Sequence, residues 1–130
     1  MVNSLAKKMR YIDGTYISED GLYVLSISDS DVNTGTFNFT FNTKESPLGN
    51  FTYSERKGSW TYAGEKHYPC GINFSAGVRD EPDWKYYMLD SWNGSRTRDG
   101  LMVLNGSRCY IVGDVSVTLY TFENIKFNLS

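Results

Sequence analysis

A chain of 130 residues can bury one hydrophobic core but not two independent ones, so we expect a single folded domain. Its formal net charge of -2 supplies no concentrated positive field, which argues against a nucleic-acid partner. Aromatic residues make up 15% of the chain beside 12 glycines and only 3 prolines, a mixture typical of short strands broken by turns. No apolar run reaches the length of a membrane span, so we expect no membrane partner.

The first nine residues show no strand pattern, and chain termini are poorly ordered unless something ties them down. We therefore expect residues 1–9 to be a flexible arm and residues 10–130 to form the domain. The arm lacks the apolar core of a secretory signal, so we expect a cytoplasmic protein. The alternative is a secreted chain whose signal was removed, in which six Asn-x-Ser/Thr triplets would be glycosylation acceptors.

The clearest element is a hairpin over residues 21–42, which follows a first strand expected over 10–18. In its second arm Phe37, Phe39 and Phe41 alternate with Asn and Thr, so the aromatic rings lie on one face and the polar groups on the other. A turn rich in Asp, Ser and Asn, over residues 29–33, joins the two arms. This period of two predicts half-buried antiparallel strands.

The rest of the chain repeats the pattern of short strands and turns. In order, we expect a strand over 49–54, a turn over 55–58, and strands over 59–62, 71–78 and 84–92. A turn between Asn93-Gly94 and Asp99-Gly100 then leads to a strand over 101–104. A hairpin turn at Asn105-Gly106 leads to a strand over 109–112, and a last strand follows over 115–122.

Eight or nine strands at regular spacing, with no convincing helix, predict an all-β fold. We expect an antiparallel up-and-down meander closed into an eight-stranded barrel, because closure removes the exposed strand edges. A β-sandwich is the alternative. An eight-stranded barrel is wide enough to hold side chains or one small ligand, so its open end is the expected place for a site.

Four short motifs, spread over most of the chain, add a family resemblance. They are Gly14-Thr15-Tyr16 followed by Gly21, Thr34-Gly35-Thr36-Phe37, Trp92-Asn93-Gly94 and Thr121-Phe122. In this order they resemble the opening Gly-Thr-Trp and following Gly, the Thr-Gly-Thr-Tyr, the Trp-Ser-Gly and the last-strand Thr-Phe of the avidin and streptavidin family. The resemblance implies a ligand-binding eight-stranded barrel.

The positions that this family uses to bind biotin are mostly different in the chain. Ser18 stands for an Asn, Leu22 and Phe39 for Ser, Phe37 for Tyr, Asp90 for Thr, Met102 for Trp and Tyr120 for Asp, and Trp92 alone is kept. Tight binding depends on several preorganised polar contacts acting together. We therefore expect that biotin is not the ligand.

Asp90 and Trp92 share one face of the strand expected over 84–92, so a carboxylate stands beside an aromatic ring. Small-molecule and sugar sites often combine these two groups. The alternative is a water-exposed Asp at the barrel rim next to a core Trp.

The thiols and the single histidine give no recognisable site. His67 and Cys70 could begin a metal site, but Cys109 is the only further thiol and a structural zinc site needs four clustered ligands. We expect no metal, no cofactor and no enzyme. Two free thiols are the simplest reading, and in a secreted chain Cys70 and Cys109 could form a disulfide.

Together these observations predict a non-enzymatic β-barrel module that binds a small molecule or short polar ligand at an open barrel end. We expect the site to be formed by Ser18, Phe37, Phe39, Trp60, Asp90, Trp92 and Tyr120. Two alternatives stay open. One is a protein-interaction or assembly module with a filled barrel and an exposed aromatic patch from Trp84, Tyr86 and Tyr87, including a homo-oligomer. The other is a glycan-binding lectin.

Overall fold

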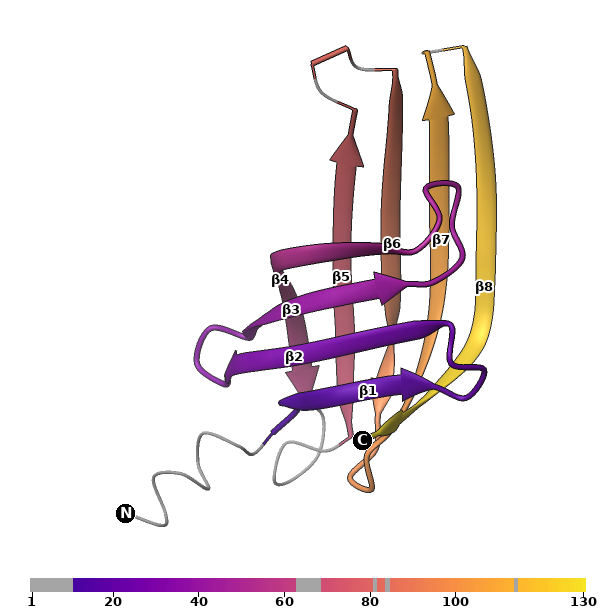
Figure 1. Cartoon of the computed structure of the whole chain (residues 1–130). Helices are drawn as coiled ribbons and strands as arrows, with labels where there is room; N and C mark the ends of the chain where they lie inside the picture. The colour runs from indigo at the N-terminus through magenta and orange to yellow at the C-terminus, as the bar shows by residue number, and fades with distance from the viewer. Residues whose placement is uncertain (1–10, 63–68, 81, 84, 114) are drawn as a thin grey trace.

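Eight antiparallel strands form a closed barrel in the computed structural model, which describes residues 11–62, 69–80, 82–83, 85–113 and 115–130. The strands are β1 (Gly14–Ser18), β2 (Tyr23–Asp31), β3 (Thr36–Thr43), β4 (Phe51–Tyr62), β5 (Cys70–Arg79), β6 (Tyr86–Arg96), β7 (Leu101–Val112) and β8 (Ser116–Leu129). Each strand pairs with the next, and β8 pairs back with β1 (Figure 1). The expected up-and-down barrel is therefore confirmed, and the sandwich is excluded.

Three expectations fall on residues that lie outside the described ranges. They are the flexible arm over residues 1–9, the contribution of His67 and the place of Trp84 in an aromatic patch. The described residues contain no helix long and apolar enough to cross a membrane.

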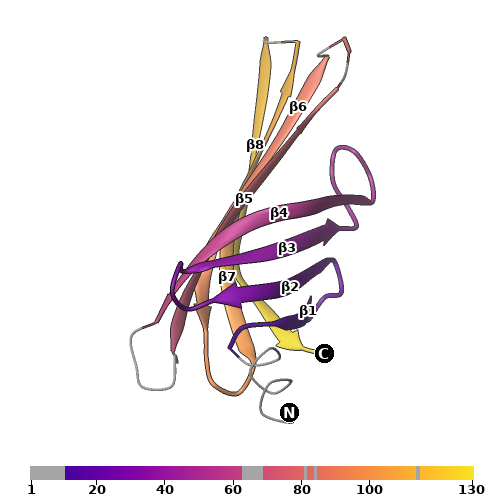
Figure 2. The ribbon, with the colours of Figure 1, turned by 90° about the vertical axis from the view of Figure 1, so that its left-hand side faces the viewer.

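The strands differ greatly in length, and this divides the molecule into two parts. β4 pairs with β5 only where Ser59–Tyr62 meets residues 70–73, and β1 pairs with β8 only where residues 16–18 meet residues 127–129. Beyond these contacts β5, β6, β7 and β8 continue together as a four-stranded sheet (Figures 1 and 2). We call this extension, residues 74–79, 86–92, 106–112 and 116–122, the overhang.

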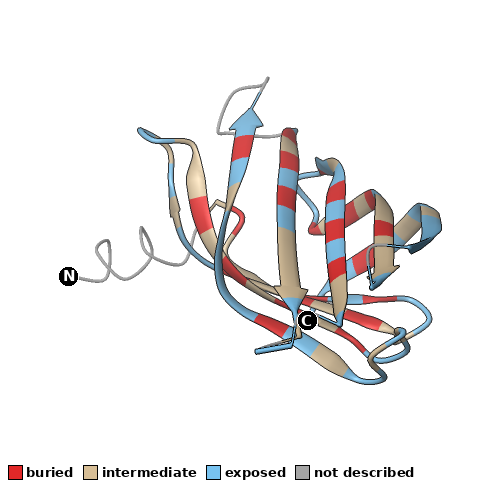
Figure 3. Ribbon diagram, turned by 90° about the horizontal axis from the view of Figure 1, so that it is seen from above, coloured by how far each residue is buried: buried red, intermediate tan, exposed pale blue. Residues whose placement is uncertain are grey.

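Aromatic side chains fill the core, both in the closed part of the barrel and between β3 and the inner face of the overhang. Phe37, Phe39 and Phe41 are 1%, 2% and 0% exposed, as their period of two predicts. The Trp92 indole lies at the centre, stacked on Phe122 at 5.2 Å between ring centroids, with Phe41 at 5.1 Å. Viewed from above, buried and exposed positions alternate along the strands (Figure 3). Packed rings therefore occupy the middle of the barrel.

The turn expected over residues 55–58 is wrong, because β4 runs through it. Phe41 pairs with Tyr53 and Phe39 pairs with Arg56, so two residues of β4 oppose one residue of β3 in a β-bulge. Glu55 takes a φ of 53° at this bulge. Gly58 has a packing role instead of a turn role, since a Cβ there would collide with the Phe37 ring.

The hairpin expected at Asn105-Gly106 is also wrong, because both residues lie inside the continuous strand β7. Gly106 is the cross-strand partner of Trp92, and a Cβ at this position would lie 2.5 Å from the indole. A glycine here leaves room for the Trp92 ring to lie against the backbone of β7. Asn93-Gly94 likewise belongs to β6 and not to a turn.

The suggested disulfide between the two thiols is excluded, since both cysteines are free. Cys70 is buried on β5, whereas Cys109 is partly exposed on β7. β6 separates these two strands.

Candidate functional site

A pocket of about 510 Å³ lies at one end of the barrel, which we call the mouth. The loop between β3 and β4 forms its rim, and the floor and wall come from β7 and β8. The residues that line it are Lys44, Glu45, Ser46, Pro47, Gly49, Arg108, Tyr120 and Phe122. The pocket therefore combines charged rim groups with aromatic walls and a buried guanidinium.

The rim loop is held by its own hydrogen bonds. The Ser46 hydroxyl donates to the Gly49 carbonyl at 2.7 Å and accepts from the Leu48 amide at 3.0 Å. The Gly49 amide donates to the Ser46 carbonyl at 2.8 Å, and Gly49 takes a φ of +77°, which favours glycine. This small closed turn fixes the rim without help from a ligand.

At the floor of the pocket, Arg108 and Asp90 form a buried ion pair across β6 and β7. Nε of Arg108 donates to Oδ1 of Asp90 at 2.8 Å, and Nη2 donates to Oδ2 at 2.7 Å. Asp90 is 3% exposed and Arg108 is 2% exposed. A bidentate ion pair of this kind fixes the plane of the guanidinium group, and the two opposite charges neutralise each other.

Two further donors complete the shell around the Asp90 carboxylate. The Tyr53 hydroxyl donates to Oδ1 at 3.0 Å, and Nε1 of Trp92 donates to Oδ2 at 3.1 Å. Burial raises the pKa of Tyr53, and the neighbouring Asp90 charge raises it further. Tyr53 therefore stays a neutral hydrogen-bond donor, and the buried charge of Asp90 is well satisfied.

Arg108 still has hydrogen-bonding capacity after it has paired with Asp90. Burial by itself lowers the pKa of Arg108, but the hydrogen bonds and the charge of Asp90 outweigh it and the pKa is raised. The guanidinium carbon lies 5.2 Å from the centre of the Phe122 ring. Among the described residues its Nη1 atom meets no acceptor, and it is not one of the fully enclosed polar atoms. Arg108 also lines the pocket, so this unused hydrogen-bonding capacity belongs to a side chain that a ligand there would contact.

Tyr23 and Thr43 bring two more polar groups to this end of the barrel. Burial raises the pKa of the Tyr23 hydroxyl, and that hydroxyl also feels the charges of Arg108 and Asp90. Thr43, paired with Tyr23 across β2 and β3, is fully buried, and its hydroxyl has no hydrogen-bond partner in the described part of the chain. The mouth thus holds neutral donors and acceptors beside the ion pair.

The structure brings together only some of the residues expected to form the site. Asp90 and Trp92 are hydrogen-bonded below the mouth, and Tyr120 lines the pocket. Ser18 lies at the end of β1 and does not line the pocket, and its hydroxyl donates to Asp20 at 2.6 Å and accepts from the Tyr23 amide at 3.0 Å.

Phe37, Phe39 and Trp60 are not part of the mouth. Phe37 and Phe39 are packed in the core, where their ring centroids lie 6.0 Å apart. Trp60 contacts Tyr11 at 5.8 Å near the start of the described chain. The expectation that these three residues line the same open end was therefore wrong.

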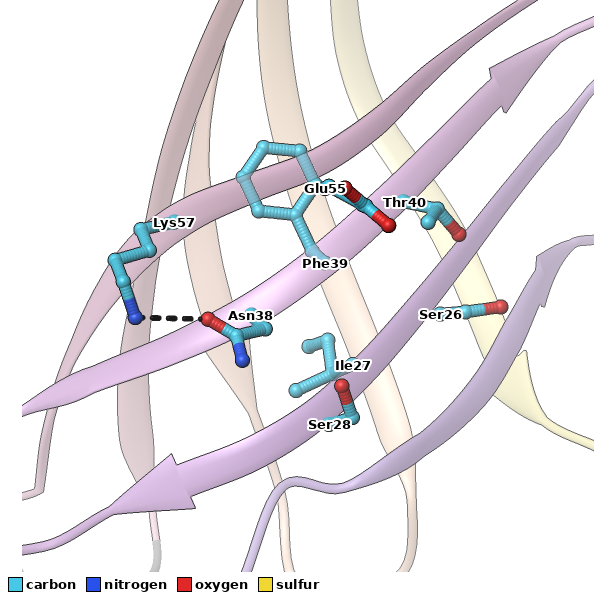
Figure 4. Close-up of a pocket in the computed structure, with 8 residues that line it drawn as sticks. All are labelled: Ser26, Ile27, Ser28, Asn38, Phe39, Thr40, Glu55 and Lys57. Atoms are coloured by element: carbon cyan, nitrogen blue, oxygen red, sulfur yellow. Dashed lines mark hydrogen bonds between the residues drawn. The ribbon is translucent and has the colours of Figure 1, made fainter.

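A second hollow, also of about 510 Å³, lies on the outer wall of β2, β3 and β4 (Figure 4). Asn38 and Lys57 meet there, with Nζ of Lys57 donating to Oδ1 of Asn38 at 2.9 Å, and Nδ2 of Asn38 donates to Asp29 at 3.0 Å. Its hydroxyl groups come from Ser26, Ser28 and Thr40. Ile27 and Phe39 also line this hollow, so it combines polar groups with apolar surface, and part of its hydrogen-bonding capacity is already used.

Comparison with known proteins adds no function. No family model matches the chain, and neither a curated protein nor a solved structure matches it. The described residues also contain no cluster of three His, Cys, Asp or Glu side chains that could hold a metal ion. What the fold establishes is an eight-stranded antiparallel barrel, and the chemistry of its mouth is the basis for inferring a function.

Proposed function

We propose that the protein is a non-enzymatic binding module that holds a small molecule or short polar ligand at the mouth of the barrel. The observation that carries this proposal is the Arg108 guanidinium, which is fixed by Asp90, has no acceptor for Nη1 among the described residues and lines a pocket of about 510 Å³. Preorganised donors in a concave, partly aromatic pocket are what small-molecule sites require.

The charge balance at the mouth favours a neutral ligand. Asp90 already neutralises Arg108, and the rim carries one cation and one anion, Lys44 and Glu45. A ligand with a carbonyl oxygen can accept from Nη1, and a flat ring can lie against Tyr120 or Phe122. A full carboxylate would meet the negative charge of Asp90 close behind the guanidinium. We therefore propose a flat molecule with a neutral carbonyl oxygen.

Biotin is not the ligand that we propose. Of the positions that the avidin and streptavidin family uses, the mouth keeps Trp92, whose indole nitrogen is here directed at Asp90. Phe37 and Phe39, which stand where that family has a Tyr and a Ser, are packed in the core.

A thermal-shift experiment with matched ligands tests the proposal, because a ligand that binds the native state raises the melting temperature. The panel contains benzamide and benzoate as a neutral and anionic pair, larger aromatic amides, biotin and simple sugars. We expect aromatic amides to raise the melting temperature more than the corresponding carboxylates do. We also expect Tyr120→Ala to remove the shift.

Tyr62→Ala is the matched control, since Tyr62 is also an exposed tyrosine but contacts Trp60, away from the mouth. This variant should keep the full shift. A shift that survives Tyr120→Ala unchanged, or no shift with any compound, would contradict binding at the mouth.

A glycan-binding function is the second candidate, and the outer hollow of Figure 4 is the observation that favours it. Hydroxyl and amide groups in an open hollow are typical partners for sugars. In that case a sugar would raise the melting temperature, Asn38→Ala would remove the effect, and Tyr120→Ala would not.

A further inference from the structure

The sheet of the overhang has two outer edges, and one of them is open. β8 pairs with β7 along its whole length, but β1 reaches it only at residues 127–129, with one more hydrogen bond from the Glu19 amide to the Lys126 carbonyl at 2.9 Å. Within the described part of the chain, nothing pairs with the other side of β8 from Ser116 to Phe122. Every second residue of this stretch therefore directs its N–H and C=O groups toward solvent.

This open edge lacks the usual protection of an edge strand. Natural proteins guard edges with charged residues, prolines or short strands. Residues 115–122 read Val-Ser-Val-Thr-Leu-Tyr-Thr-Phe, without a charge or a proline. Val117 and Leu119 are 67% and 61% exposed on one face of the strand, and Val115, in the turn just before it, is 89% exposed. An uncharged, apolar and extended edge is a template for pairing with another strand.

The opposite edge of the same sheet, on β5, is different. There Nη2 of Arg56 approaches the Gly77 carbonyl at 3.4 Å, so the bulged strand β4 places a charged side chain over this edge. The last residue of β5 is Arg79. If the β8 edge of one copy paired with the β5 edge of another, it would meet these charges. Such head-to-tail pairing would also leave a free edge on each copy, so it would not form a closed dimer.

We propose that the open edge of β8 pairs antiparallel with β8 of a second copy of this chain. A strand that pairs with itself about a two-fold axis forms a closed contact in which both partners use the same residues. Because residues 115–122 carry no charge, no like charges face each other in this arrangement. The two four-stranded sheets would then become one continuous eight-stranded sheet.

A two-fold axis through Thr118 gives the best match of side chains. It places Val117 of each copy opposite Leu119 of the other, so the exposed apolar side chains become cross-strand neighbours. It also places the two Thr118 side chains opposite each other, where hydroxyl pairs are favourable. A contact of two strands is smaller than the roughly 800 Å² per partner of a standard stable interface, so we expect a concentration-dependent dimer.

Sedimentation velocity over a concentration series from about 1 µM to about 500 µM tests the pairing, since weak dimers change their populations in that range. We expect the wild-type chain to move from monomer to dimer. Leu119→Lys places two like charges in the contact and should raise the dissociation constant about tenfold or more.

Leu89→Lys is the matched control, because Leu89 is also exposed and lies on the same face of the sheet as Leu119. Leu89 pairs with Cys109, which pairs with Leu119, but it belongs to β6, which is not an edge strand of the overhang. This variant should leave dimerisation unchanged, whereas two sheets stacked face to face would be disrupted by both variants. A wild-type chain that is monomeric at every concentration, equal effects of the two lysines, or growth beyond a dimer would each overturn the proposal.

A cross-link tests the register in a Cys109→Ser background. Thr118→Cys should give a disulfide-linked dimer on oxidation, because the two-fold axis brings the two sulfur atoms together. Ser107→Cys, on the inner strand β7, should remain monomeric under the same conditions. A cross-link that forms equally at both positions would overturn the register.

Discussion

The closed part of the barrel uses all eight strands, whereas the overhang is formed by β5, β6, β7 and β8 alone. In the closed part, Leu104 on β7 and Phe127 on β8 are fully buried by packing against the neighbouring strands. In the overhang, Val117 and Leu119 on β8 are mostly exposed. The two pairs of residues lie on opposite faces of the sheet, and on the inner face of the overhang Met88 and Trp92 are only 0% and 1% exposed. Strand pairing by itself therefore does not bury a side chain, because only the face that has a second layer packed on it is buried.

The Asp90–Arg108 pair lies on the inner face of the overhang, where Tyr53 of β4 contacts it, and breaking it should have the largest effect. Arg108→Ala leaves a buried carboxylate without its cation, and we expect the free energy of unfolding to fall by about 3–5 kcal/mol. Urea denaturation measures the change. Lys57→Ala, an exposed side chain on β4, is the control and should change stability by less than about 0.5 kcal/mol.

Removing both charges sharpens this test. The double variant Asp90→Leu with Arg108→Met should be more stable than Arg108→Ala alone, because no unpaired charge is left in the interior. If Arg108→Ala unfolds no more easily than Lys57→Ala, the ion pair does not stabilise the fold.

A pair of leucine truncations compares the buried inner face of the closed part with the outer face of the overhang. Leu104→Ala removes fully buried methyl groups from the closed part and should reduce the free energy of unfolding by about 2–5 kcal/mol. Leu119→Ala, in the overhang, should change it by less than about 0.5 kcal/mol when the protein is dilute. Similar losses in the two variants would mean that the overhang is covered in solution.

Tyr53→Phe should have a smaller effect that depends on pH. The variant loses the hydroxyl that donates to Asp90, at a cost of about 1 kcal/mol near neutral pH. Burial and the Asp90 charge raise the pKa of Tyr53 in the native state. Above the unfolded pKa of about 10, the unfolded chain therefore loses this proton first, and the wild-type free energy of unfolding falls as pH rises.

Urea denaturation between about pH 8 and pH 11 checks the alkaline effect of Tyr53, a range that spans the pKa of an unfolded tyrosine. The fall should be less steep in Tyr53→Phe than in the wild type. Thr52→Ala, exposed on the outer face of β4, should keep the wild-type slope. Parallel curves for Tyr53→Phe and the wild type would show that this hydroxyl does not contribute to alkaline unfolding.

Much of the fold could be predicted from residue periodicity, and the errors have one physical cause. The period of two at Phe37, Phe39 and Phe41 predicted the buried face of β3, which is confirmed. Gly58 and Gly106 were read as turn residues, but each lies under an aromatic ring of the neighbouring strand. A glycine that makes room for a ring and a glycine that makes a turn look alike in one sequence, because the difference depends on the cross-strand partner.

The same misreading of Gly106 as a turn residue explains why Arg108, on which the proposed site depends, was not predicted. Asp90 and Trp92 could be placed on one face from the sequence, and their hydrogen bond agrees with that. Arg108 was missed because the hairpin expected at residues 105–106 interrupted β7. Along the continuous strand β7, residues 102, 104, 106 and 108 lie on the same inner face, so the period of two already indicates that Arg108 points inward. That Asp90 lies opposite Arg108 depends on register, which a single strand does not reveal.

The up-and-down order of the strands also decides how the molecule can be attached to something else. Because the number of strands is even, the start of β1 and the end of β8 lie at the same end of the barrel. There the Ser130 amide donates to the Thr15 carbonyl at 2.8 Å. The rim loop of the mouth lies at the other end of the barrel, between β3 and β4. A dye, a bead or a carrier domain joined at Ser130 would therefore lie away from the rim loop, so the chain can be attached to a surface without covering the pocket.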